Sequence, residues 1–285
     1  MQLGECPRWN KHEARWYWVD ILNSQLYRAP KNGLPLQQRT LPFMPGCFFF
    51  TEQNQILLTS NNGIYLLPSF SAEPVCLIES NQLPQGQRFN DGTATPDGRF
   101  IAGTLLNGVS KTGVSFSGCF TNPKSLHLKE LTERYTIING QCFSPDGNRY
   151  YVADSPRCAV WQFDYDKISG ALSNKQLFYQ FESELEFPDG AATDVNGNYW
   201  VALYGTGKIA VISPQGNRLK DIQLPVSQPT MVAFGGSHGD ELLITSAAQS
   251  LNNAQLEQQP LAGSVFLLKT NTKGTTQTLL RHPTN

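Results

Sequence analysis

Three short phrases rich in side-chain oxygens recur along the chain at nearly even intervals. They begin at Asn90, Asn139 and Asp189, which lie 49 and 50 residues apart, and each phrase contains a glycine. Carboxylate and carboxamide oxygens are the ligands that hard cations such as calcium, magnesium and manganese prefer. A fold that brought these three positions together would therefore build a site for a divalent cation.

The phrases also have a simpler explanation, because Asn-Gly and Asp-Gly are common turn dipeptides. Their phasing favours a site. After each phrase comes a turn sequence, at 96–98, 145–147 and 196–197, and then a strand rich in aromatic residues. A fixed period of this size is typical of a repeat fold, in which one position recurs in successive units.

Extending the period toward both ends gives six copies, separated by 41, 44, 49, 50 and 41 residues. Their lead residues are Glu5, Gly46, Asn90, Asn139, Asp189 and Thr230. Each copy continues with an apolar strand, then a third strand, and leaves room for a weaker fourth. Four strands in about 40 to 50 residues is the spacing of propeller blades. The sequence therefore predicts an all-β, six-bladed β-propeller with four-stranded antiparallel blades, as a single domain over residues 1–285.

The alternative fold is a β-sandwich, or a pair of all-β domains, with coincidental turn spacing. The three-strand order recurs in phase six times, which favours the propeller. Helical periodicity is weak throughout, and residues 250–259 are expected to form a connecting loop with at most a short helical turn.

The innermost strand of every propeller blade lines the central channel, so the lead residues should meet around one axis. Two carboxylates and two carboxamides would then converge at one mouth: Glu5, Asp189, Asn90 and Asn139. Like charges brought together are costly unless a cation or a proton lies between them. Arg88 and Asp91 would add a cation and a further carboxylate nearby, although Arg88 could equally be a loop arginine paired to a surface acid.

Composition excludes several other classes of protein. Hydrophobic residues make up 40% and charged residues only 16%, with 24 Gly and 18 Pro, which suits many short strands joined by turns. The formal net charge of −1 gives no electrostatic basis for binding nucleic acid or an anionic membrane. No apolar run approaches the roughly 20 residues of a membrane span. We therefore expect neither partner.

The cysteines and histidines show no sign of a disulfide framework or a zinc site. The six cysteines include no C-x-x-C pair, and the four histidines have no metal-ligand spacing. No signal peptide is visible at the start of the sequence. We expect reduced, mostly buried cysteines and a cytoplasmic location.

Phrases spread over nearly the whole sequence resemble the regucalcin / gluconolactonase / luciferin-regenerating enzyme family of six-bladed propellers, also known as senescence marker protein-like propellers. The matching phrases include Gly4-Glu5-Cys6-Pro7, Arg88-Phe89-Asn90-Asp91-Gly92, Asn139-Gly140, Pro188-Asp189-Gly190 and Pro229-Thr230. Together these phrases are specific, whereas any one alone is weak.

The resemblance implies one divalent cation held by Glu5, Asn139 and Asp189. Calcium is expected first, with zinc, manganese and magnesium as alternatives. It also implies that Asp189 is the catalytic acid/base and that Arg88 and Asn90 contact the substrate. Asp91 and Asn107 are further candidates for the site.

Three features depart from the family pattern. Family members often carry an acidic substrate-binding residue shortly after the Gly-Thr phrase. In this sequence no acid follows Gly103-Thr104, and Asn107 could be a neutral substitute for it. Cys6 replaces a glycine that is common in the first phrase. Family members usually carry an extra N-terminal strand before this phrase that helps to close the ring, whereas only three residues precede Gly4. Either the start of the sequence is truncated, or the closure between the first and last blades is weaker.

The leading hypothesis is a metal-dependent lactonase, a carboxylic ester hydrolase that opens a sugar lactone with metal-activated water and Asp189 as acid/base. The same site could instead hydrolyse another lactone, an ester or an organophosphate. A non-enzymatic calcium-binding propeller is the alternative from another class, since fold alone does not decide function. The expected partner is a small molecule.

Overall fold

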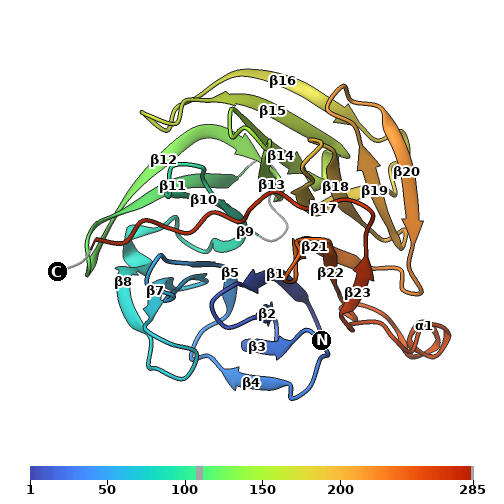
Figure 1. Ribbon diagram of the computed structural model, residues 1–285, viewed down its shortest axis with the longest axis horizontal. Coiled ribbons are helices and arrows are strands. Elements are labelled where there is room, and N and C mark those ends of the chain that lie inside the picture. Colours follow the sequence, from blue (N-terminus) through green and yellow to red (C-terminus); the bar gives the residue numbers. More distant parts are fainter. Residues whose placement is uncertain (107–111, 284–285) are drawn as a thin grey trace.

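The chain forms a ring of six β-sheets around a central channel (Figure 1). The computed structural model describes residues 1–106 and 112–283. Within each sheet the strands pair antiparallel in sequence order, with the first strand of each blade innermost. The predicted six-bladed β-propeller is confirmed. Asn107, a candidate from the sequence, lies outside the described residues.

The strands of the first three blades are β1 (Gly4–Asn10), β2 (Arg15–Asp20), β3 (Gln25–Pro30), β4 (Gln37–Thr40), β5 (Pro45–Phe50), β6 (Ile56–Ser60), β7 (Gly63–Leu67), β8 (Val75–Glu79), β9 (Arg88–Ala94), β10 (Phe100–Leu105), β11 (Gly113–Asn122) and β12 (Ser125–Tyr135). Those of the last three are β13 (Ile138–Phe143), β14 (Arg149–Asp154), β15 (Ala159–Tyr165), β16 (Leu172–Gln180), β17 (Phe187–Thr193), β18 (Tyr199–Tyr204), β19 (Lys208–Ile212), β20 (Arg218–Gln223), β21 (Pro229–Gly235), β22 (Glu241–Ser246) and β23 (Phe266–Lys269).

The last blade has three strands among the described residues, where the other five have four. After β23 the chain crosses one face of the ring, as the red segment in Figure 1 shows. Isolated bridges pair Gly274 with Asp194 and Leu280 with Thr51, so this segment ties the fifth blade to the second. We call residues 270–283 the C-terminal segment.

The first and last blades close the ring through short contacts near the N-terminus. Leu3 forms an antiparallel bridge with Ala247, and the Met1 ammonium donates to the Gly263 carbonyl at 2.6 Å. The connection from β22 to β23 in the last blade contains α1 (Asn253–Gln258), a short helix in the stretch where at most a helical turn was expected. No helix among the described residues has the length and apolarity needed to cross a membrane.

The innermost strand of every blade is irregular at the recurring position. The ladder to the second strand shifts between Glu5 and Arg8 in β1, and the other five inner strands have corresponding shifts. A β-bulge of this kind bends its strand and redirects a side chain. The lead residues therefore lie at bulges of the channel-lining strands.

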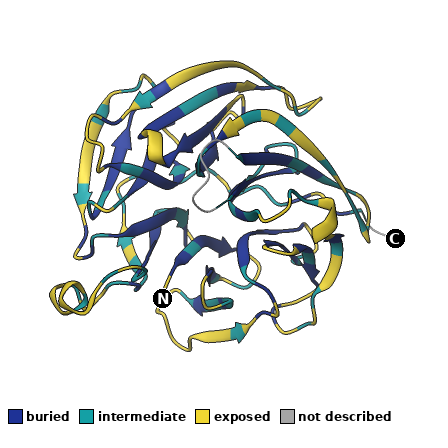
Figure 2. Cartoon of the chain, turned by 180° about the vertical axis from the view of Figure 1, so that it is seen from behind, coloured by how far each residue is buried: buried dark blue, intermediate teal, exposed yellow. Residues whose placement is uncertain are grey.

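Most of the core lies between the blades. Aromatic side chains such as Tyr17, Phe48, Phe100, Tyr151 and Trp200 are almost fully buried, and the inner strands are dark blue in Figure 2. All six cysteines are free, and four of them are buried, so most are buried as expected. This close packing makes the inner strands a rigid frame for the channel.

Candidate functional site

The asparagine of the fourth blade is placed by the glycine that follows it. Gly140 has a φ of +60°, a left-handed conformation that side chains rarely adopt, and its carbonyl accepts a hydrogen bond from Tyr199 Oη at 2.9 Å. Gly190 follows Asp189 in the next blade, where an added Cβ would lie 2.2 Å from Met231 Cγ. The Asn-Gly and Asp-Gly dipeptides are therefore bulge positions and not hairpin turns.

A chain of hydrogen bonds joins the third and fourth blades at the channel mouth. Arg88 Nη1 donates to Asn90 Oδ1 at 3.0 Å, and Asn90 Nδ2 donates to Asn139 Oδ1 at 2.7 Å. The same Asn90 amide also reaches the Ile138 carbonyl at 3.1 Å. The structure thus brings together three residues that the sequence placed at one mouth.

Ser155, which the sequence analysis did not select, fixes the orientation of the Asn139 amide. Asn139 Nδ2 donates to Ser155 Oγ at 2.8 Å, and Ser155 Oγ donates to the Pro188 carbonyl at 2.7 Å. Because the Nδ2 side is engaged there, Asn139 Oδ1 faces the mouth. Ser155 also connects Asn139 with the backbone directly before Asp189.

Two carboxylates at the mouth have strongly raised pKa values. Desolvation is the largest cause of the raised pKa of Glu5, followed by the negative charges of Asp189 and Asp91. Desolvation also dominates the raised pKa of Asp189, with the charge of Asp91 second. Arg88 and nearby backbone N–H groups oppose both shifts only in part. Without a cation, these acids hold protons more tightly than free carboxyls do.

Asp91 lies close to this mouth, but its oxygens are engaged by the backbone. Its Oδ1 accepts from the Gly92 N–H at 2.7 Å and its Oδ2 from the Gln141 N–H at 3.0 Å. Burial raises the pKa of Asp91 to about 6, against these hydrogen bonds, which lower it. Asp91 therefore joins the bulge of β9 to β13 at Gln141, two residues after Asn139.

Arg88 is half-buried and faces the mouth carboxylates. Burial lowers the pKa of its guanidinium, while the charges of Glu5 and Asp189 raise it. No carboxylate among the described residues lies within ion-pairing distance of Arg88, so the alternative of a loop arginine paired to a surface acid does not hold. Its guanidinium contacts the Phe89 carbonyl and Asn90.

Tyr204, at the end of β18, is a further residue of the mouth that the sequence analysis did not select. Burial raises the pKa of its hydroxyl to about 12, and the charges of Asp189 and Glu5 add to the shift. The hydroxyl of Thr230, in contrast, donates to the Gly4 carbonyl and lies 2.8 Å from the Thr245 hydroxyl. Among the lead residues, Thr230 therefore helps to close the ring and does not offer a free donor to the mouth.

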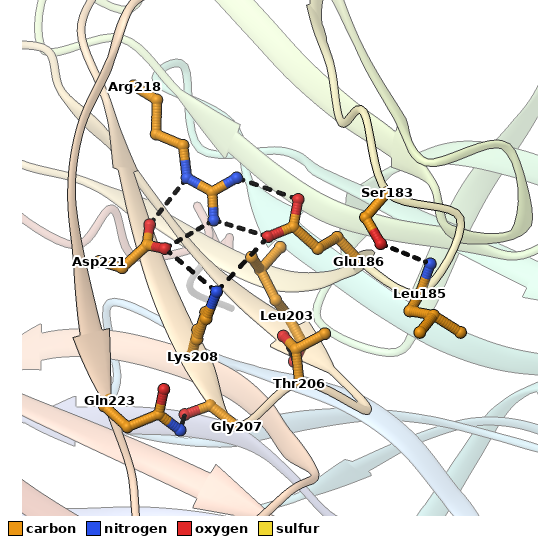
Figure 3. A network of polar contacts seen from close by, with 10 residues as sticks. All are labelled: Ser183, Leu185, Glu186, Leu203, Thr206, Gly207, Lys208, Arg218, Asp221 and Gln223. Carbon is orange, nitrogen blue, oxygen red and sulfur yellow. Dashed lines mark hydrogen bonds and ion pairs between the residues drawn. The ribbon is translucent and has the colours of Figure 1, made fainter.

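The loop that leads into Asp189 is held by a group of charged residues on the outside of the fifth blade (Figure 3). Arg218 donates to Glu186 Oε1 and Oε2 at 2.7 and 3.0 Å, and to Asp221 at 2.7 and 2.8 Å. Lys208 lies 3.5 Å from Asp221. Glu186 is buried and lies three residues before Asp189, so this network anchors the loop from its outer side.

A groove of about 830 Å³ adjoins the mouth. Its lining combines apolar side chains with amides, and includes Leu3, Leu83, Leu106, Gln87, Gln249 and Arg88. Arg88 is the single charged residue that lines it among the described residues. The groove is therefore suited to a neutral or anionic ligand that presents oxygens to Arg88.

The donor set at the mouth fits a hard divalent cation. It consists of two carboxylates, Glu5 and Asp189, and the Asn139 amide oxygen, whose orientation Ser155 fixes. A cation between the carboxylates would remove the cause of their mutual destabilisation. Within the described residues no three His, Cys, Asp or Glu side chains form a metal-binding group, and this set instead combines two carboxylates with one amide oxygen.

The fold and the mouth define a class: six-bladed propellers whose inner-strand bulges gather carboxylates and amides at one end of the channel. Residues 3–248 match the family described as SMP-30/Gluconolactonase/LRE-like region. The chain belongs to this family, as the resemblance in its phrases indicated.

Relatives of named activity cover almost the whole chain. The chain is 35% identical over 279 residues to a 6-deoxy-6-sulfogluconolactonase of Pseudomonas putida. The aligned region covers 97% of this chain and 94% of the relative. Among solved structures, it is similar to a calcium-binding protein, regucalcin, from Agrobacterium tumefaciens, with a TM-score of 0.92 and 25% identity over 99% of this chain and 94% of that one. A luciferin-regenerating enzyme matches with a TM-score of 0.87 and 25% identity over 98% and 95%. Lactonases among the relatives suggest a hydrolase.

Proposed function

We propose that the protein is a lactonase that depends on a divalent cation and opens a sugar lactone to its hydroxy acid. The observation that carries the proposal is the meeting of Glu5, Asp189 and the Asn139 amide oxygen at one mouth, beside Arg88 and Asn90. Membership of a family that includes gluconolactonases supports the substrate class.

Glu5, Asn139 and Asp189 would hold the cation, with calcium as the first candidate. When bound there, a divalent cation supplies Lewis acidity to the mouth. The relative solved as a calcium-binding protein supports calcium. Ser155 would keep the Asn139 oxygen turned toward the mouth throughout the reaction.

Asp189 is proposed to act as general base and then as general acid. Its carboxylate takes a proton from the attacking water as the new C–O bond forms at the lactone carbonyl carbon. The same proton then passes to the ring oxygen as the ring C–O bond breaks, so the products are a carboxylic acid and a hydroxyl on one chain. Asp189 is therefore both a proposed ligand of the cation and the proposed proton carrier.

Arg88 and Asn90 are proposed to hold the substrate oxygens. Arg88 lines the groove next to the mouth, and its contact with Asn90 orients both side chains. A guanidinium binds oxygen atoms through several N–H donors in fixed geometry. The relative from Pseudomonas putida acts on a sulfonated sugar lactone by its name, so a sugar lactone with an anionic group at C6 is a second substrate to test against Arg88.

The test is a pH-drop assay of lactone hydrolysis with added calcium. Its substrates are glucono-1,5-lactone, the 6-sulfonated analogue, a non-sugar lactone and a phosphotriester. Hydrolysis of the sugar lactones above the spontaneous rate is expected. Turnover of only the non-sugar lactone or the phosphotriester would support a different hydrolase, and calcium binding without any turnover would support a binding protein.

A further inference from the structure

A buried arginine lies at the opposite end of the channel from the proposed lactonase mouth. Arg8, directly after the bulge of β1, is only 8% exposed. Its Nη2 donates to the Gly92 carbonyl at 2.8 Å, and its guanidinium lies 5.1 Å from the centre of the Phe49 ring. The Arg8 side chain thus extends from the first blade, over the second, to the third.

The Arg8 guanidinium keeps unused hydrogen-bonding capacity. Its Nε is buried without a hydrogen-bond partner, and no carboxylate in the described parts of the chain lies within 4.0 Å of it. Asp91 is the acid whose charge faces it, but both Asp91 oxygens accept backbone N–H groups. A guanidinium has five N–H donors, and leaving buried donors unpaired is costly.

Arg8 lines a cavity of about 400 Å³ at this end of the channel. The ends of the inner strands form its wall and the C-terminal segment covers it, crossing the face that is in front in Figure 1. Hydroxyl-bearing residues line it, among them Thr93, Thr276 and Thr278. The hydroxyls of Ser144, Thr193 and Thr275 also lie in its wall, but they donate to Asp146, the Phe143 carbonyl and the Thr193 carbonyl. Asp146 is the one acid that lines it among the described residues, and its carboxylate is bonded by Ser144 and Asn148 at the exposed rim.

We propose that Arg8 and the surrounding hydroxyls form a second binding site, for a small molecule that carries a phosphate group. Arginine matches the oxygens of a phosphate with parallel N–H donors, and hydroxyl groups add further donors. Burial strengthens these contacts because water does not compete for them. The cavity is many times the roughly 30 Å³ of a water molecule, so it has room for more than the phosphate itself.

Calorimetry with inorganic phosphate and with a hexose phosphate tests this site, in buffer with chelator so that calcium phosphate does not form. The wild-type protein is expected to bind both at one site, with the hexose phosphate tighter. Arg8→Met is expected to weaken binding at least tenfold. Lys124→Met, which removes an exposed cation away from the cavity, and Arg88→Met, at the lactonase mouth, are expected to leave binding unchanged.

Three results would overturn the proposal: no binding of either probe by the wild-type protein, equal binding by Arg8→Met, or loss of binding in Arg88→Met, which would place the phosphate at the lactonase mouth. Circular dichroism checks that Arg8→Met is folded. If it is not folded, Arg8→Lys, which keeps the charge but loses the planar set of donors, is expected to weaken binding severalfold. Unchanged binding in Arg8→Lys would then count against the site. These outcomes do not depend on lactone hydrolysis.

Discussion

Asn139 and Ser155 form the hydrogen bond that decides which atom of the Asn139 amide faces the channel mouth. The 2.8 Å contact engages Nδ2, and the Ser155 hydroxyl donates a hydrogen bond to the Pro188 carbonyl. One hydroxyl therefore orients a proposed metal ligand and braces the strand that carries Asp189. Mutating a hydrogen-bond partner of a metal ligand typically costs roughly 10–100-fold in metal affinity or activity.

Ser155→Ala is therefore expected to weaken calcium binding by about 10-fold or more, because the Asn139 amide is then free to rotate. Isothermal titration calorimetry with calcium measures this change. Ser183→Ala is the matched control, since Ser183 Oγ accepts only the Leu185 N–H on the exposed loop before β17. Equal calcium affinity in Ser155→Ala and in the wild type would show that Ser155 does not orient the ligand.

Calcium binding is expected to release protons and to weaken as the pH falls. The raised pKa values of Glu5 and Asp189 mean that these carboxyls hold protons in the metal-free protein, whereas ligands must be deprotonated. Titrations at pH 6 in buffers of different ionisation enthalpy measure the protons released. A calcium affinity that is independent of pH between 5 and 8, with no proton release, would contradict this expectation.

The same groups set the pH dependence of stability without metal. Their folded pKa values lie above the ordinary values of 4.5 and 3.8, so the folded state binds more protons than the unfolded state. Their contribution to stability is fully present below the ordinary values and is lost as the pH rises through the folded values. Thermal unfolding with chelator should therefore show that Glu5→Gln raises Tm relative to the wild type more at pH 8 than at pH 5. An equal difference in Tm at both pH values would be the contrary result.

Arg88→Lys is expected to raise the KM for a sugar lactone by roughly 10-fold, because lysine cannot reproduce the guanidinium contact with Asn90 and the substrate. Initial rates over a range of lactone concentrations measure KM. Arg39→Lys is the control, since Arg39 bonds only the carbonyls of Phe70 and Ala72, away from the mouth. A normal KM in Arg88→Lys would remove Arg88 from the proposed substrate site.

Arg218→Met is expected to lower the free energy of unfolding by about 1–3 kcal/mol. Exposed ion pairs stabilise a protein only slightly, whereas leaving a buried charge unpaired costs much more. The expected loss lies between the two because Glu186 is buried while Arg218 is partly exposed. Urea unfolding monitored by fluorescence measures it. Lys175→Met, which removes an ion pair with Glu133 on an outer strand, should cost less. Equal costs for the two variants would show that the Glu186 network gives the Asp189 loop no special support.

The period of the lead residues was enough to predict the propeller and the meeting of Asn90 and Asn139, because the blades repeat and their inner strands share one axis. The bulges were not predicted, since a bulge depends on register between strands. The roles of Ser155 and Asp91 depend on contacts between blades, such as the 2.7 Å bond from Ser155 to Pro188. Spacing along the sequence does not report such contacts.

The most direct test of the account is the rate of sugar-lactone hydrolysis in four samples: the calcium-loaded wild type, the wild type with chelator, the chelated wild type with calcium restored, and calcium-loaded Asp189→Ala. The account predicts rapid hydrolysis in the first and third samples and only the spontaneous rate in the second and fourth. Asp189→Ala should also lose calcium binding, while its circular dichroism spectrum is unchanged. Full lactonase activity in folded Asp189→Ala would contradict the central claim that this carboxylate holds the cation and transfers the proton.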